Sequence, residues 1–308
     1  MHKYISIIIS IFIISVAGYM VMHKKQQKRK ERIKIDSIGM IHKSDQCGQE
    51  GEFFIEKGIM HPVTIDLSQK RYKGIVLYHG LDQIYHPKSW ERFEYFSTYT
   101  VDNKGNLYLI PMPFISIRPV TFDLLKNLYR IDTNTGKLSI FMHFDDIKPS
   151  STNPFGLNAI AYDCDNGTLW ISAIDESDYQ TQKGVIYHID PKNKKILARF
   201  EGWDAFSLAV VKTNKGKFLF LGSAKDSGLY AMKITKNNLI MSKPVKLFDL
   251  SNPEEHIRKI KVKEKNRLEI QTIPFTYTLI TESGKKERNY YDVYYDEIDD
   301  TWDILKKI

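Results

Sequence analysis

Five polar residues stand ahead of a repeated strand pattern, and their side chains could together bind a small ligand or an ion. Counted back from the turn of each repeat, they are His61, Ser97, Asn158, Ser207 and Arg258. Imidazole, hydroxyl, amide and guanidinium groups supply both hydrogen-bond donors and acceptors. The alternative is that polar residues at strand ends satisfy backbone groups and bind nothing. Binding requires strands that bring the five residues to one place.

Each of these residues precedes a hairpin of one kind. It has a strand of alternating apolar residues, a polar turn that usually contains Gly, and a second strand that begins with an apolar residue. The clear copies are YTVDNKGNLYLIPM at 99–112, IAYDCDNGTLWISAI at 160–174 and LAVVKTNKGKFLFLGSA at 208–224, and the weaker copies lie at 63–80 and 260–274. A second type of hairpin alternates with the first, at 127–144, 185–202 and 228–248.

Two alternating hairpins give four strands, and a four-stranded unit that recurs about every 45 residues is typical of a β-propeller blade. Residues 35–308 are long enough for about six blades, although five or seven blades, or a β-sandwich, stay open. We expect the sixth blade to combine residues 35–60 with the strands of 289–308, which would close the ring. The innermost strands of a propeller converge on a central channel, so the five polar residues would meet at one mouth of it.

The stretch GLNAIAYDCDNGTLWIS at 156–172 resembles the six-bladed propellers of the senescence marker protein and gluconolactonase superfamily, and the similarity extends over about residues 95–250. The resemblance implies a divalent cation in the central channel, often Ca²⁺, held by a Glu, one or two Asn and an Asp. Asn158 matches by position, and Asp204 is the candidate for the Asp, although Ser207 occupies the aligned position. No Glu stands in the matching context. The pattern therefore offers fewer oxygen ligands than a hard cation requires.

Other chemical motifs are absent or incomplete. The sequence has no HExxH, no Gly-rich phosphate loop and no GxSxG nucleophile elbow. DCDNGTLW at 163–170 begins like a calcium-binding loop, but Ile174 stands where that loop needs its closing Glu. We therefore expect a structural turn there.

Residues 4–22 carry no charge and predict a single membrane-spanning helix. Nineteen residues rising about 1.5 Å each nearly cross a hydrocarbon core of about 30 Å. A cleaved signal peptide is the alternative, with a small-x-small site at Ser15-Val16-Ala17. The apolar residues continue past that site to Met22, which favours a retained anchor over removal of residues 1–17. The chain thus divides into a segment at 1–34 and a propeller domain at 35–308.

Residues 23–34 hold seven Lys or Arg and one Glu, so they contribute +6 of the formal net charge of +8. The rest of the chain is close to neutral, which argues against a nucleic-acid surface. The basic residues of 24–34 are expected to contact anionic lipid headgroups. Basic residues flanking a span favour a cytoplasmic position for the domain that follows, whereas comparable anchored propellers are exported. The side of the membrane stays open.

The two cysteines, Cys47 and Cys164, lie far apart and share no metal-binding spacing, so two unpaired thiols are expected. A disulfide between them would instead indicate an oxidising compartment.

The sequence favours a non-enzymatic binding or scaffolding propeller for a small ligand or a partner protein at the membrane. The alternative is a metal-dependent lactonase or esterase-like hydrolase in which the cation polarises a carbonyl and a water. Whether the protein is an enzyme is left undecided.

Overall fold

The computed structural model describes residues 38–42, 63–67, 72–79, 83–114, 119–235, 243–279 and 287–307. Residues 39–308 form one compact unit. The predicted anchor at 4–22, the basic run at 24–34, His61 and Cys47 lie outside the described residues. In the ranges that are described, no helix is long and apolar enough to cross a membrane.

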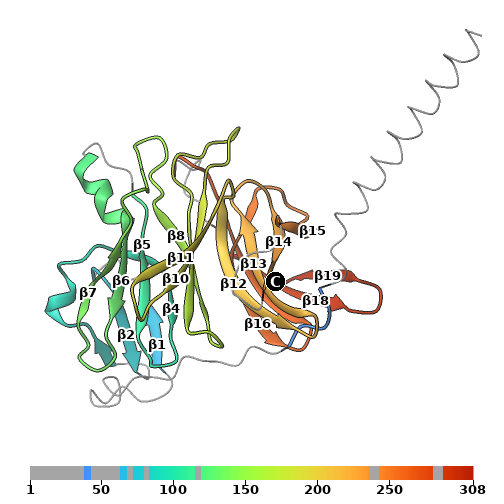
Figure 1. The fold of residues 1–308 in the computed structure, drawn as a ribbon, viewed down its shortest axis with the longest axis horizontal. Helices are drawn as coiled ribbons and strands as arrows, with labels where there is room; N and C mark the ends of the chain where they lie inside the picture. The colour runs from blue at the N-terminus through green and yellow to red at the C-terminus, as the bar shows by residue number, and fades with distance from the viewer. Residues whose placement is uncertain are drawn as a thin grey trace, which may run out of the picture. The chain divides into compact units, whose positions relative to one another are not determined.

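The described residues form an all-β propeller with five antiparallel sheets, and each sheet is one blade whose strands follow the order of the chain (Figure 1). Blade 1 is β1 (Val63–Asp66), β2 (Val76–His79) and β3 (Gln83–Tyr85); blade 2 is β4 (Phe96–Val101), β5 (Leu107–Pro111), β6 (Asn127–Ile131) and β7 (Leu138–His143). Blade 3 is β8 (Leu157–Asp163), β9 (Thr168–Ala173), β10 (Val185–Asp190) and β11 (Lys195–Glu201); blade 4 is β12 (Ala205–Thr213), β13 (Gly216–Ser223), β14 (Gly228–Ile234) and β15 (Val245–Asp249). Blade 5 is β16 (Glu255–Glu264), β17 (Arg267–Pro274), β18 (Asn289–Asp296) and β19 (Thr301–Lys306), and two short 3₁₀ helices are η1 (Lys88–Trp90) and η2 (Pro119–Lys126).

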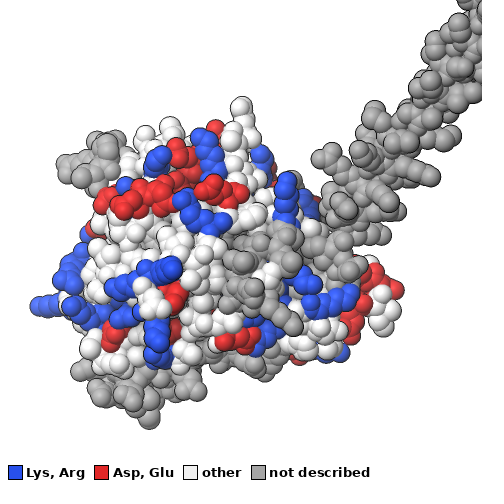
Figure 2. All heavy atoms as spheres, viewed as in Figure 1, with Lys and Arg blue, Asp and Glu red and all other residues white. Residues whose placement is uncertain are grey.

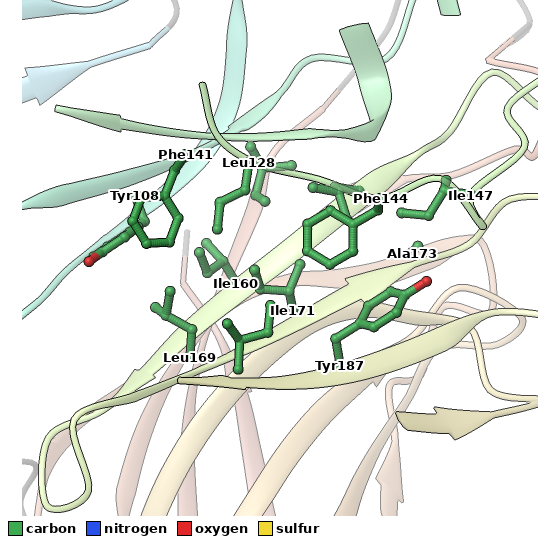
Figure 3. Close-up of a cluster of buried hydrophobic side chains, with 13 residues drawn as sticks. Tyr108, Leu128, Phe141, Phe144, Ile147, Ile160, Leu169, Ile171, Ala173 and Tyr187 are labelled. Atoms are coloured by element: carbon green, nitrogen blue, oxygen red, sulfur yellow. The ribbon is translucent and has the colours of Figure 1, made fainter. Parts of the chain in front are cut away.

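Burial along the strands follows from the packing of blade against blade. The second strand of blade 3, β9, is buried at every residue, because blades 2 and 4 cover its two faces. The outer strand β11 is mostly exposed. Figure 3 shows the apolar cluster between blades 2 and 3, where Tyr108, Phe141 and Leu128 face Ile160, Ile171 and Tyr187. Removal of this apolar surface from water is what holds neighbouring blades together.

The turns of the inner hairpins carry the backbone conformations that the sequence predicts. Gly105 and Gly167 have φ of 81° and 65°, a region that costs glycine little because it has no Cβ. Asn266 stands at the corresponding turn of blade 5 and has φ of 55°. Asparagine is among the few other residues that adopt this region readily, so the weak copy of the repeat still forms the same hairpin.

The prediction that the C-terminal strands join residues 35–60 in a sixth blade is wrong. β18 pairs with β17, with Leu268 opposite Val293, and β19 pairs with β18. Residues 289–306 thereby complete blade 5 from one continuous stretch of chain, because the edge of β17 is the nearest unpaired edge. Of the segment 35–60, residues 39–42 contact the turns of blades 4 and 5. Ile41 forms a bridge with Thr213, and its N–H donates to Oδ1 of Asn266 at 2.7 Å.

Candidate ligand site at the start of the inner strands

Each of the four inner strands β4, β8, β12 and β16 begins with a β-bulge. The pairing with the next strand skips one residue between Phe96 and Thr98, between Leu157 and Ala159, between Ala205 and Ser207, and between Ile257 and Lys259. The bulged residues are therefore Ser97, Asn158, Phe206 and Arg258. A bulged residue is left out of the ladder, which frees its backbone groups for other partners. The same device at the same place in four blades makes this end of the inner strands distinct.

Three of the predicted polar residues, Ser97, Asn158 and Arg258, are these bulged residues. On β12 the bulged residue is Phe206, so Ser207 lies one position further on, where its Oγ accepts the N–H of Gly222 at 3.2 Å. Counting back from the turn missed this shift, because Phe206 lies ten residues before Gly216, whereas Asn158 lies nine residues before Gly167.

Arg258 joins three blades through its guanidinium. Nη1 donates to the main-chain oxygen of Phe206 at 2.8 Å and to that of Asn158 at 3.2 Å, and Nη2 donates to the same Asn158 oxygen at 3.3 Å. The guanidinium carbon lies 4.9 Å from the centre of the Phe206 ring, a cation–π contact. The bulges of β8 and β12 thus supply the carbonyls that hold the side chain from β16.

Asn158 belongs to the same group of contacts. Its side chain is buried, and Nδ2 donates to the carbonyl oxygens of Ala205 at 3.0 Å and Phe206 at 3.2 Å. Ser97, in contrast, directs its hydroxyl to its own blade, where it lies 3.2 Å from the oxygen of Pro111. The structure therefore brings Asn158 and Arg258 together, with Phe206 between them.

Asp204 is held elsewhere. Its side chain is fully buried, and Oδ1 accepts the hydroxyl of Ser177 at 2.6 Å and the N–H of Gly184 at 2.8 Å, while Oδ2 accepts the hydroxyl of Tyr277 at 2.6 Å. Burial raises the pKa of the Asp204 carboxyl, and the hydrogen bonds act in the opposite direction. This carboxylate ties the β9–β10 connection to the chain after β17.

The residues at the bulges do not fit a divalent cation. Ca²⁺ takes six to eight oxygen ligands, mostly carboxylates and carbonyls. Here the carbonyls of Asn158 and Phe206 already accept from a guanidinium, and the Asp204 carboxylate accepts three hydrogen bonds. A cation at these carbonyls would also meet the positive charge of Arg258. Among the described residues, no cluster of three or more His, Cys, Asp or Glu could hold a metal.

The positive charge of Arg258 has no acidic partner in the ranges that the structure describes. The Arg258 side chain is half-buried. Burial lowers the pKa of Arg258 to about 10, which still leaves it protonated at neutral pH. On the face of the molecule shown in Figure 2, both basic and acidic side chains lie at the surface.

The opposite ends of β8, β12 and β16 line a small cavity. The cavity has a volume of about 40 Å³, and its lining includes His42, Tyr162, Asp163, Cys164 and Lys212. This volume suits water and excludes an organic ligand. The prediction of unpaired thiols is wrong for Cys164, which is disulfide-bonded.

No protein-family model matches the sequence. No curated protein matches it either. The predicted membership of the gluconolactonase superfamily, with its six blades, thus has no support from a family match.

Several solved structures are similar to this chain at low identity. The tricorn protease is 11% identical over 76% of this chain and 25% of its own, with a TM-score of 0.40, so this chain spans about a quarter of that protein. Hsv2 of Kluyvelomyces marxianus is 14% identical over 77% of this chain and 69% of its own, with a TM-score of 0.34. The Dos1 propeller is 11% identical over 64% of this chain and 60% of its own, with a TM-score of 0.35.

Proposed function

We propose that this protein is a non-enzymatic binding propeller whose ligand binds at the bulged starts of the inner strands. The observation that carries the proposal is the contact of Arg258 with the carbonyls of Asn158 and Phe206. It fixes a half-buried, charged side chain between three blades without an acidic partner among the described residues. Rigid polar groups of this kind orient ligands with little loss of conformational entropy on binding.

The same contacts weigh against the metal-dependent hydrolase. Its chemistry would require Asn158 and Asp204 to share one cation, yet the Asp204 carboxylate is engaged with Ser177, Gly184 and Tyr277. The bulged residue that contacts Asn158 is the cation Arg258. These residues favour a site that attracts negative charge.

We also propose that residues 4–22 anchor the protein in a membrane, with the basic residues of 24–34 on the headgroups, and that the propeller lies in an oxidising compartment. The disulfide at Cys164 supports the compartment, because such bonds persist where thiols are not kept reduced. The basic residues of 24–34 instead favour the cytoplasmic side, because Lys and Arg that flank a membrane span tend to stay in the cytoplasm. A covalent bond is the more direct indicator, so we place the propeller outside the cytoplasm.

Location and disulfide are tested together in intact cells. A membrane-impermeant thiol reagent of high mass should fail to modify Cys164 until a reductant is added, and the protein should stay in the membrane pellet after alkaline extraction. Labelling without reductant would contradict the oxidising compartment. Release by alkaline extraction would contradict the anchor.

The binding function is tested by thermal unfolding of the full chain in neutral detergent against sugars, amino acids, organic acids and metal ions. We expect at least one class to raise the melting temperature of the wild type and of Arg267→Lys, but not of Arg258→Met. Arg267 lies in the same blade and is paired with Glu264 and Asp292. No effect from any class, or the same effect in Arg258→Met, would contradict the proposal.

A further inference from the structure

The hydrogen bonds of Arg258 use one side of its guanidinium, and the donors on the other side make no hydrogen bond within the described residues. The group has five N–H donors. Both Nη1 hydrogens are used, toward Phe206 and Asn158, and Nη2 shares the Asn158 oxygen with Nη1. That oxygen therefore lies on the edge between the two terminal nitrogens. The remaining donors are Nε–H and the second hydrogen of Nη2, which point the same way.

The Nε/Nη2 edge, which makes no second hydrogen bond among the described residues, has the geometry that recognises a carboxylate. Its two parallel N–H groups match the two oxygens of a carboxylate, and such bidentate pairs are strong and directional. Contact with the Phe206 ring, which also packs 4.7 Å from the ring of Phe275, limits rotation of the guanidinium plane. The edge is thus presented in one orientation before any ligand arrives.

The positive charge of Arg258 also lacks a negatively charged partner within the described residues. Other arginines with two-point contacts in this protein have acidic ones: Arg267 lies 2.8 Å from Glu264 and 3.1 Å from Asp292, and Arg199 lies 2.8 Å from Asp146. Within the described residues, Arg258 donates hydrogen bonds only to main-chain carbonyls and packs on the Phe206 ring, so none of these partners is acidic. A partly buried charge without a counter-charge is unfavourable, and a bound anion would relieve that cost.

We propose that the Nε/Nη2 edge of Arg258 binds the carboxylate of a small organic acid at the bulged starts of β8, β12 and β16. This assignment rests on the proposed binding function and names the chemical class of its ligand. It also predicts that the site discriminates against a neutral amide of the same shape. An amide offers one oxygen and two N–H donors, so it would place a donor against a donor of Arg258.

The test is calorimetric titration of the full chain in neutral detergent with benzoate and with benzamide as the matched neutral ligand. We expect benzoate to bind and benzamide to bind at least about tenfold more weakly, a difference that corresponds to about 1.4 kcal/mol. Arg258→Lys keeps the charge but lacks the two-point edge and should weaken benzoate at least about tenfold. Arg267→Lys is the control and should bind benzoate like the wild type.

A second arm uses a short peptide with a free or an amidated C-terminus, which separates free acids from chain ends as the source of the carboxylate. If the peptide with a free C-terminus binds tightly and benzoate does not bind, the small-acid assignment is overturned. Equal binding of benzoate and benzamide, or an unchanged affinity in Arg258→Lys, would also overturn it. If another ligand class stabilises the wild type but not Arg258→Met, the binding function stands and only the carboxylate assignment fails.

Discussion

Nη1 of Arg258 lies 2.8 Å from the main-chain oxygen of Phe206, and both residues are bulged residues of adjacent blades. The bulge of β12 frees the carbonyl that the side chain from the bulge of β16 then takes. The two irregularities therefore complement each other. They place a charged side chain where four inner strands begin.

Arg258→Met should lower the free energy of unfolding by about 2 to 3 kcal/mol, because the carbonyls of Asn158 and Phe206 lose their charged donor. Denaturant titration at neutral pH measures this loss in the free energy of unfolding. Arg199→Met is the control, since Arg199 forms partly exposed ion pairs and should cost less than about 1 kcal/mol. Equal losses in the two variants would mean that the contacts of Arg258 add nothing to blade packing.

Asp204→Ala should cost about 3 kcal/mol or more, because the donors of Ser177, Gly184 and Tyr277 would be left without their acceptor. Chemical denaturation measures the loss. Asp145→Ala is the comparison, since Asp145 is 97% exposed and its removal should change stability by less than about 0.5 kcal/mol. A loss of that small size in Asp204→Ala would show that the carboxylate does not tie these segments together.

His188 should make the protein less stable in mild acid. The imidazole is buried and stacks on Trp170, with 4.1 Å between the centres of the two rings. Burial lowers the pKa of His188 below the ordinary value of 6.5. As the pH falls through 6.5, the unfolded chain binds a proton that the folded protein does not, so stability falls until the folded pKa is reached.

His188→Gln should reduce this loss by up to about 1.4 kcal/mol for each pH unit within that window. Melting temperatures of wild type and variant from pH 7.5 down to 5 measure the difference. The burial of His256 lowers its pKa in the same direction, so some dependence should remain in the variant. Parallel curves for wild type and His188→Gln would argue against the buried neutral imidazole.

Gly222→Ala should destabilise the contact between blades 4 and 5. A Cβ there would overlap the main-chain oxygen of Ile257 and lie 2.6 Å from Oγ of Ser207. Overpacking of this kind costs about 1 to 3 kcal/mol. Gly202→Ala is the matched variant: it has φ of 78° and no neighbour within 4 Å, so only backbone strain of about 1 to 2 kcal/mol applies. Gly222→Ala should form an altered blade interface, visible as changed amide exchange in β16, and Gly202→Ala should not.

The hairpins could be predicted from the sequence because their signals are local. Alternating apolar residues, together with Gly105, Gly167 or Asn266 at the turn, mark both strands and the reversal between them. The number of blades could not be predicted in this way. Which edge the strands at 289–306 choose depends on partners far along the chain, and the sequence pattern does not distinguish closure of the ring from completion of blade 5.

The candidate site was predictable in part for the same reason. Ser97, Asn158 and Arg258 were found by counting back from the turns, since each lies eight or nine residues before the turn residue Gly105, Gly167 or Asn266. Phe206 was missed because an apolar residue gives no polar signal, and the bulge moves Ser207 into the ladder. The contacts of Arg258 with carbonyls on two other blades could not be predicted from the sequence. Every residue has a main-chain carbonyl, so residue type does not indicate which carbonyl accepts a hydrogen bond.

The most direct measurement is of the Arg258 Nε–H itself. With ¹⁵N-labelled arginine in the full chain, the Arg258 signal is assigned by its absence in Arg258→Lys and followed during titration with benzoate and benzamide. Our account predicts that benzoate moves the Nε–H proton signal downfield, as expected for a new charge-assisted hydrogen bond, and that benzamide does not. A signal that stays in place while benzoate binds, or that moves equally with benzamide, would contradict the central claim.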